Sequence, residues 1–304
     1  MAGEGKFRIL GDSKRAYMTP TIFRILLFLY GIFLTIVATG QPGVPDSVAR
    51  LDAEGQVNWY AEQCWALREK APDRALSYGE EGIRIAKAHG LDTERAQLYG
   101  YMGVIHQHYK RQIASAISWY HEALELSLQT GDSVEIAYVY NNLGDAFYQA
   151  GNVTLAEEYA RRSMEIFRRL DNRRGMAYGY INMGLVHNMK REHDSALYYF
   201  RSAIDLREQQ EDSVGIASAV LEVARTLLSM GHFETAMIHF RESLAMHREM
   251  ENLDYTAHSM QGIGDVHLEQ HAADSARAYY HHAMALYNKK KHYPGVIASQ
   301  VGLA

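Results

Sequence analysis

Two stretches of this sequence, NNLGDAFYQAGNVTLAEEYA (141–160) and INMGLVHNMKREHDSALYYF (181–200), decide the fold because the second repeats the first forty residues later. In each stretch a glycine follows an apolar residue, and an alanine stands twelve positions after that glycine. The phase is kept along the chain by the small residues Gly144, Gly184, Ala224, Gly264 and Ala304, and by Ala156, Ala196, Ala236 and Ala276. An earlier copy carries Gly103 and Ala116, with one extra residue in its turn. A fixed period of this length indicates an array of repeated units.

Each unit reads as two amphipathic helices, because its apolar residues recur at spacings of three and four. The first helix carries Ala137, Tyr140, Leu143, Gly144 and Phe147, and the second carries Ala156, Tyr159, Ala160, Ser163, Ile166 and Phe167. Small residues such as Gly144 allow two helices to approach closely, while the aromatic residues fill the space between hairpins. One hairpin cannot cover its own apolar faces, so the units must stack on their neighbours.

The order Leu-Gly, aromatic, Gly, Ala, aromatic, Ala resembles the tetratricopeptide repeat (TPR). The segment 142–147 is similar to its first helix and the segment 196–206 to its second. The resemblance covers residues 52–304, although Ala224 replaces the small glycine and His187 and His267 replace the aromatic residue. It implies an all-α TPR α-solenoid of antiparallel helix hairpins that form a right-handed superhelix.

The chain divides into four predicted segments. Residues 1–40 contain the uncharged run ILLFLYGIFLTIVA (25–38) after Lys14, Arg15 and Arg24, the order of a secretory signal peptide. The run is short for a membrane-spanning helix, so we prefer a cleaved signal to an N-terminal membrane anchor; the true start is either Met1 or Met18. A linker (41–50), the TPR array of about six helix pairs (51–294) and the first half-helix of an incomplete repeat (295–304) follow.

The stretch WALREKAPDRAL (65–76) resembles the opening repeat of exported TPR sensor modules in bacterial signalling proteins. In that family a histidine kinase or a transcriptional regulator follows the array across the membrane. The resemblance therefore implies an exported protein, periplasmic or anchored in the inner membrane and facing the periplasm. The apolar segment 296–304 further suggests a longer parent chain, or self-association through an uncapped C-terminal repeat.

Composition and motifs argue against other functions. The net charge of −5 disfavours nucleic-acid binding, and the single Cys64 excludes an intrachain disulfide. His267 and His271 have the four-residue spacing of metal ligands on a helix, but His106, His187 and His267 occupy one repeat position, which favours packing over ligation. No phosphate-binding loop or nucleophile elbow is present in the sequence. We therefore expect no catalytic residues, no metal and no cofactor.

The first helices of a stacked array line its inner, concave face, where a protein or an extended peptide would bind. The residues expected on that face are Tyr138, Asn141, Asp145, Tyr148, Tyr178, Ile181, Asn188, Arg225, His258, Gln261 and Asp265. Asn142 and Asn182 share one phase, and they either begin a ladder that pairs with a peptide backbone or pair with neighbouring backbone. Membrane contact is expected only through the N-terminal segment.

Three hypotheses for function follow. The first is a non-enzymatic binding module that forms the extracytoplasmic sensory part of a signal-transduction protein. The second is a free-standing envelope scaffold for the assembly of protein complexes. The third, a metal or hydrolase site on His267 and His271, has the least support.

Overall fold

The computed structural model describes residues 45–290, 295–296, 299–300 and 302, and every regular element among them is a helix. The chain forms two units, residues 1–56 and 57–304. The described part of the first unit contains the short helix α2 (Asp46–Ala49), which lies within the predicted linker, and the start of α3. The predicted signal segment (1–40) lies outside the described residues. Within the described part of the chain, no helix is both long enough and apolar enough to cross a membrane.

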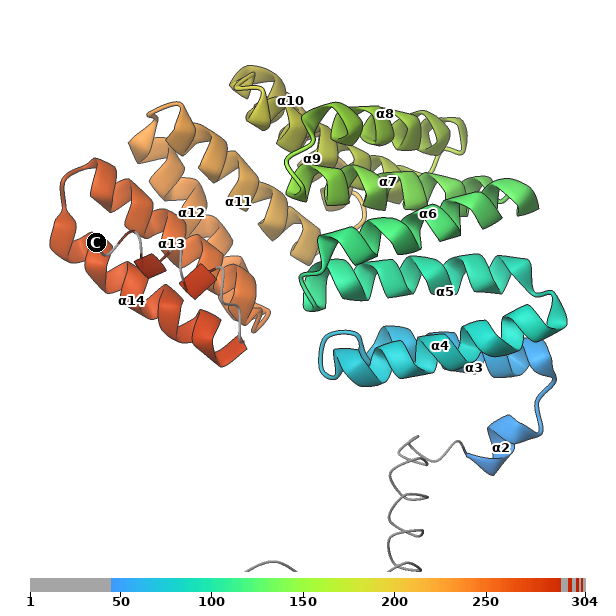
Figure 1. Cartoon of the computed structure of the whole chain (residues 1–304). Coiled ribbons are helices and arrows are strands. Elements are labelled where there is room, and N and C mark those ends of the chain that lie inside the picture. Colours follow the sequence, from blue (N-terminus) through green and yellow to red (C-terminus); the bar gives the residue numbers. More distant parts are fainter. Residues whose placement is uncertain (1–44, 291–294, 297–298, 301, 303–304) are drawn as a thin grey trace, which may run out of the picture. The chain divides into compact units, whose positions relative to one another are not determined.

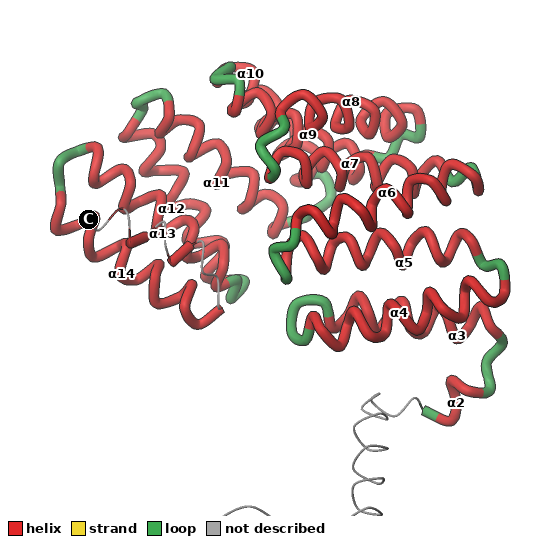
Figure 2. The backbone as a smooth tube through the Cα atoms, in the orientation of Figure 1, coloured by secondary structure: helices red, strands yellow, loops and turns green. Residues whose placement is uncertain are grey.

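Twelve helices, α3 to α14, form six antiparallel hairpins (Figures 1 and 2). Hairpins 1 to 3 are α3 (Ala53–Leu67) with α4 (Pro72–His89), α5 (Asp92–Val104) with α6 (Ile113–Thr130), and α7 (Ser133–Gln149) with α8 (Val153–Arg169). Hairpins 4 to 6 are α9 (Arg173–Met189) with α10 (His193–Glu208), α11 (Ser213–Ser229) with α12 (Phe233–Glu249), and α13 (Leu253–Glu269) with α14 (Ala273–Lys290). From α4 to α14 each helix packs on the next one along the chain, and α3 contacts α4 through the rings of Tyr60 and Tyr78. Residues 57–290 therefore form the expected all-α solenoid of helix hairpins.

Within a hairpin, a small residue on the first helix faces either an aromatic ring or another small residue on the second helix. A Cβ atom on Gly184 would overlap the fully buried ring of Phe200, and one on Gly264 would lie 2.8 Å from the Tyr280 ring. At Gly144 the facing residue is Ala160, and the backbones themselves approach, with the Ala160 nitrogen 3.2 Å from such a Cβ. The predicted close approach of the two helices is therefore confirmed, by two different arrangements.

The turns follow the same period. In hairpins 2 to 6 the middle residue of the turn has positive φ, and it falls at one phase. It is Arg111, Gly151, Arg191, Gly231 or His271, and only glycine adopts this conformation without strain. Four helix starts forty residues apart are capped by side chains, at Asp132, Asn172, Asp212 and Asn252.

Hairpin 2 differs from the others. The extra residue between Gly103 and Ala116 does not lengthen the turn, as the sequence suggested; it is absorbed in a π-helical segment, η1 (Ile105–Tyr109), that continues α5. A π-helical turn accommodates one inserted residue without breaking the helix, and it changes the direction of the side chains that follow.

The described residues of the segment 295–304 are helical and pack on hairpin 6. The Gly302 backbone lies against the Tyr280 ring. A Cβ atom added to Gly302 would be 2.6 Å from that ring. Val296 packs against the apolar core of hairpins 4 to 6, and Ser299 is fully buried. The remaining residues of the predicted half-helix lie outside the described part.

Candidate functional site

The first helices of neighbouring hairpins contact one another, α5 with α7, α7 with α9, α9 with α11 and α11 with α13. They therefore line the inner face of the array, as predicted, and the second helices form the outer layer. The inner face is the candidate functional site because its polar side chains come from several hairpins at once.

Five side chains from α7, α11 and α13 interact electrostatically on this face: Asp145, Tyr148, Glu222, Arg225 and Tyr255. We call this group the inner cluster. The Arg225 guanidinium donates to the Glu222 carboxylate at 2.7 Å, and both belong to α11. Tyr148, two hairpins earlier, has its pKa raised to about 12 by burial and by the negative charges of Glu222 and Asp145, with Arg225 acting in the opposite direction. Burial and the charges of Glu222 and Asp145 also raise the pKa of Tyr255.

Asp145 is held by amide groups. Its Oδ2 atom accepts from Gln107 Nε2 at 2.7 Å and from Gln149 Nε2 at 3.0 Å, and His108 Nε2 lies 3.8 Å away. Gln107 is fully buried, and its Oε1 atom accepts from the Tyr120 hydroxyl at 2.7 Å. The π-helical turn η1 places Gln107 and His108 beside α7, so hairpin 2 supports the inner cluster through Asp145.

A second polar group lies on hairpin 6. The Tyr287 hydroxyl lies 2.6 Å from His258 Nδ1 and donates to Gln261 Oε1 at 3.0 Å. Asp265 accepts a hydrogen bond from the Tyr280 hydroxyl at 2.7 Å, and burial raises the pKa of the Asp265 carboxyl. Three residues predicted for the inner face, His258, Gln261 and Asp265, are thus positioned by tyrosines of α14.

The asparagines form a contact between hairpins. Asn182 Nδ2 donates to both the backbone oxygen and the Oδ1 atom of Asn141 at 2.9 Å, and the two residues are only 7% and 9% exposed. Of the two alternatives for Asn182, pairing with neighbouring backbone is therefore observed. Its partner is Asn141; Asn142, at the equivalent phase of hairpin 3, is half-buried. A contact of these asparagines with a partner stays a prediction.

Three other predicted residues lie against packing partners. The Tyr138 ring meets Phe167 edge-on at 4.9 Å between centroids, and the Arg207 guanidinium lies 4.9 Å from the Tyr178 ring centre. Asn188 Nδ2 donates to Thr226 Oγ1 at 2.7 Å. The structure thus brings together Asp145, Tyr148 and Arg225, whereas Tyr138, Tyr178 and Asn188 contact their own or the adjacent hairpin.

Sequence reasoning missed Glu222 and Tyr255. Glu222 stands at the phase of Asn142 and Asn182, so extending that column by one period would have found it. Tyr255 stands at the phase of Gly175 and Gly215 and stacks on the buried His247 ring at 4.9 Å. Hairpins 4 and 5 have glycine at this phase, so a tyrosine in hairpin 6 is a departure from the repeat. That departure was the sequence signal that could have identified Tyr255 as a site residue.

The repeat-phase histidines pack on aromatic rings of the second helix. His106, His187 and His267 stack on Trp119, Tyr199 and Tyr279 at 6.4, 5.1 and 5.6 Å, as Phe147 stacks on Tyr159. The prediction that they are packing residues is confirmed. Over residues 45–290 and the few described beyond them, no three His, Cys, Asp or Glu side chains gather as metal ligands would.

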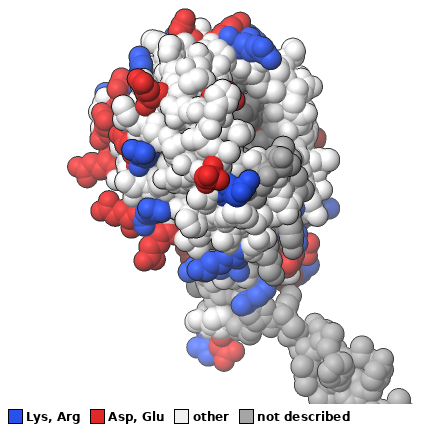
Figure 3. Space-filling model, turned by 90° about the vertical axis from the view of Figure 1, so that its left-hand side faces the viewer, with Lys and Arg blue, Asp and Glu red and all other residues white. Residues whose placement is uncertain are grey.

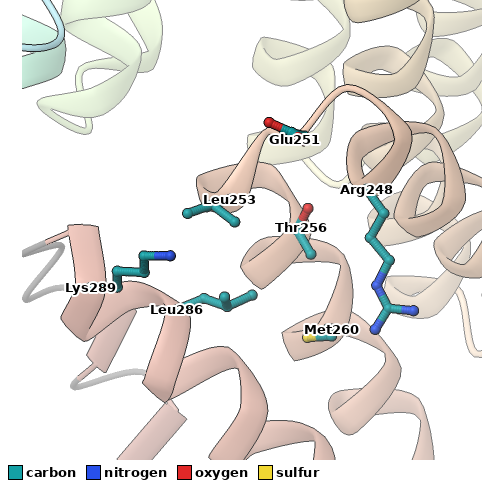
Figure 4. Close-up of a pocket in the computed structure, with 7 residues that line it drawn as sticks. All are labelled: Arg248, Glu251, Leu253, Thr256, Met260, Leu286 and Lys289. Atoms are coloured by element: carbon teal, nitrogen blue, oxygen red, sulfur yellow. The ribbon is translucent and has the colours of Figure 1, made fainter.

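Elsewhere on the surface of the described residues, the charged side chains and one pocket form no defined site. The face shown in Figure 3 carries acidic side chains along one edge, scattered basic ones and wide uncharged areas. A pocket of about 520 Å³ lies at hairpin 6, where Leu253, Met260 and Leu286 form apolar walls (Figure 4). Arg248, Glu251, Thr256 and Lys289 complete its lining.

The sequence profile of the tetratricopeptide repeat matches residues 94–169 and 173–249, which are hairpins 2 and 3 and hairpins 4 and 5. The chain belongs to the tetratricopeptide repeat family. No curated protein sequence matches this TPR chain.

Solved TPR structures share the fold at low identity. NprR in complex with its cognate peptide NprX has a TM-score of 0.67 and 14% identity, over 92% of this chain and 81% of NprR. A Rap protein complexed with competence and sporulation factor has a TM-score of 0.64 and 16% identity, over 81% of this chain and 80% of Rap. The signal transduction ATPase PH0952 from Pyrococcus horikoshii, described as having a TPR sensor, has a TM-score of 0.61 and 14% identity, over 81% of this chain. This chain spans only 36% of the length of PH0952.

Proposed function

We propose that this TPR protein is a non-enzymatic binding module that holds an extended peptide, or an extended segment of a protein, on its inner face. The observation that carries the proposal is the inner cluster, where carboxylate, guanidinium and tyrosine side chains of three separate hairpins converge.

The chemistry of the inner cluster suits a peptide. Tyr148 and Tyr255 offer ring faces to apolar or cationic side chains, and their hydroxyls offer hydrogen bonds. Asp145 and Glu222 accept from backbone N–H or ammonium groups, and Arg225 donates to carbonyl or carboxylate groups. A single chain lying along the inner face would satisfy both kinds of group in turn. NprR, solved with its cognate peptide, and Rap, solved with competence and sporulation factor, support this choice of ligand by analogy of fold.

The test is a selection of random peptides displayed on phage against the immobilised full chain. We expect enriched peptides to bind Tyr148→Ala and Arg225→Ala at least tenfold more weakly, with unchanged helical circular dichroism. Tyr198→Ala is the control, because Tyr198 is 65% exposed on the second helix α10. Peptides that lose affinity equally for Tyr198→Ala, or that ignore all three substitutions, would contradict binding at the inner face.

We further propose that the module is the extracytoplasmic sensory part of a bacterial signal-transduction protein, exported by the segment 1–40 and periplasmic or anchored in the inner membrane. Support comes from the apolar run 25–38, from the resemblance of residues 65–76 to exported TPR sensors, and from the fold shared with PH0952, which has a TPR sensor. A fusion of residues 1–50 to alkaline phosphatase tests export, because that enzyme is active only after translocation. An inactive fusion would contradict export.

The alternative is a free-standing envelope scaffold. It differs from a sensor in the number and permanence of its partners. Affinity purification that returns several partners in stable stoichiometric complexes would favour the scaffold. Capture of one partner whose binding changes with the peptide would favour the sensor.

A further inference from the structure

One ion pair joins distant parts of the array. The Arg111 guanidinium, in the turn of hairpin 2, lies 3.8 Å from the Asp254 carboxylate, in the first turn of α13 in hairpin 6. The two residues are 143 positions apart in the sequence. In a stacked array each hairpin contacts only its neighbours, so a contact between hairpins 2 and 6 must cross the inner face.

The path to this contact begins at the π-helical turn. The inserted residue in η1 lets Lys110 N bond to Ile105 O at 3.0 Å and Gln112 N to His106 O at 2.8 Å, with Arg111 between them at φ 57°. The same phase is glycine in hairpins 3 and 5, at Gly151 and Gly231. Hairpins 2 and 4 instead have arginine at this strained position, as Arg111 and Arg191, and in hairpin 2 this arginine forms the ion pair with Asp254.

Other charges act across the same gap. Asp145, from hairpin 3, raises the pKa of Tyr255 in hairpin 6, and Arg111 lowers the pKa of Tyr287, which burial raises overall. His108 lies 3.8 Å from Asp145 on the near side. The contact between Arg111 and Asp254 is therefore one part of a zone where hairpins 2 and 3 face hairpin 6.

We propose that Arg111 and Asp254 form a clasp that closes the inner face between hairpins 2 and 6, and that its opening controls access to the inner cluster. The existence of the clasp is independent of the proposed function, whereas its role in peptide entry rests on it.

The properties of the pair suit a reversible closure. Both side chains are partly exposed, at 46% and 34%, and a partly exposed ion pair is weak and screened by salt. Small rotations between neighbouring hairpins add up along a stacked array, so the distance between hairpins 2 and 6 can change without breaking any one interface. A weak ion pair between these two hairpins therefore shifts the equilibrium between a form with the pair and a form without it.

The first experiment measures the distance between hairpins 2 and 6 in the full chain without ligand. Glu122→Cys on α6 and Arg277→Cys on α14, both exposed, carry spin labels, while the thiol of Cys64 is buried with its pKa raised to about 12 and does not compete. We expect a narrow distance distribution that broadens and shifts outward in Arg111→Gln and in Asp254→Asn. The exchange Arg111→Asp with Asp254→Arg should restore the narrow distribution.

The control is Arg161→Gln, which removes an ion pair with Glu157 inside α8 at 2.9 Å. A distribution that is the same in the parent chain, the two single variants and this control overturns the clasp. Broadening that the charge exchange fails to reverse also overturns it, because the effect would then not depend on the pair.

Access is measured by hydroxyl-radical footprinting, which needs no ligand. We expect oxidation of the half-buried Tyr148 to rise severalfold in Arg111→Gln, with oxidation of the outer residue Tyr198 unchanged. Equal oxidation of Tyr148 in both proteins overturns the control of access. Neither result depends on the peptide selection, so a failure of the clasp and a failure of the proposed function are separate outcomes.

Discussion

Asn182 spans the boundary between hairpins 3 and 4 with one amide nitrogen, which donates to both the backbone oxygen and the side-chain oxygen of Asn141 at 2.9 Å. The contact is largely buried and fixes the offset of α9 against α7. The stability of a stacked array is close to a sum over its repeats and their interfaces. A hydrogen bond between hairpins 3 and 4 therefore adds to the free energy of unfolding of the whole array.

Removal of this amide should therefore destabilise the array measurably. We expect Asn182→Ala to lower the free energy of unfolding by about 1–2 kcal/mol, since it leaves the largely buried Oδ1 atom of Asn141 without this donor. Urea denaturation followed by circular dichroism gives the value. Asn142→Ala, at the equivalent phase of hairpin 3 and half-buried, is the matched control, and an equal loss in both variants would contradict the role of the Asn182 amide.

Gly184→Ala should destabilise the protein by about 1–3 kcal/mol, because the added methyl group overlaps the buried ring of Phe200. Inside a helix, replacement of glycine by alanine without steric conflict is stabilising by roughly 0.5–1 kcal/mol. Thermal unfolding therefore distinguishes the two cases: overlap with Phe200 lowers the midpoint, and absence of overlap raises it. An unchanged or raised midpoint would show that the two helices do not approach as closely as described.

Arg191 occupies the left-handed region at φ 61°, where hairpins 3 and 5 have glycine. We expect Arg191→Gly to raise the free energy of unfolding by up to roughly 1 kcal/mol, because an L-residue is strained there. Gly231→Ala should produce a loss of similar size in the equivalent turn. Urea denaturation of both variants measures these changes in the free energy of unfolding. Arg191→Ala is the control, because it keeps an L-residue at the strained position. Equal stability of Arg191→Gly and Arg191→Ala would contradict the strain.

Glu135 makes stability depend on pH. Burial, with a smaller effect of the Asp132 charge, raises the pKa of the Glu135 carboxyl from 4.5 to about 7. Its contribution is complete below pH 4.5 and falls as the pH rises toward 7, because the unfolded chain loses the proton first. We expect Glu135→Gln to be more stable than the parent chain above pH 7, by on the order of 1–3 kcal/mol.

Urea denaturation at several pH values between 4.5 and 8 tests this expectation. The exposed Glu122→Gln should keep the pH dependence of the parent chain. A slope that persists in Glu135→Gln would assign the pH dependence to another group.

Much of the fold was predictable from the residues. The spacing of Gly184 and Ala196 predicts a helix hairpin, because small residues twelve positions apart are opposed only when the chain reverses between them. The packing role of His187 followed from a repeat position that elsewhere holds phenylalanine, and in the structure its ring stacks on Tyr199. Local periodicity and size complementarity act over about forty residues, and the sequence displays both directly.

The candidate site was only partly predictable. The phase placed Asp145, Tyr148 and Arg225 on first helices, but it gave no reason to bring hairpins 3 and 5 together. Tyr255 replaces a glycine of the repeat, and its position depends on the stacking of its ring on His247. The π-helical turn of hairpin 2 was visible as one extra residue, yet its consequence for Arg111 was not.

The sequence by itself thus determined the repeating unit, the two helices of each unit and the faces that they bury, since all three depend on contacts within a hairpin or between adjacent ones. Only the tertiary structure decided which inner side chains meet across the array, such as Arg111 with Asp254. Those meetings depend on rotations between hairpins that are small in each step and accumulate over four of them, and no single stretch of residues encodes their sum.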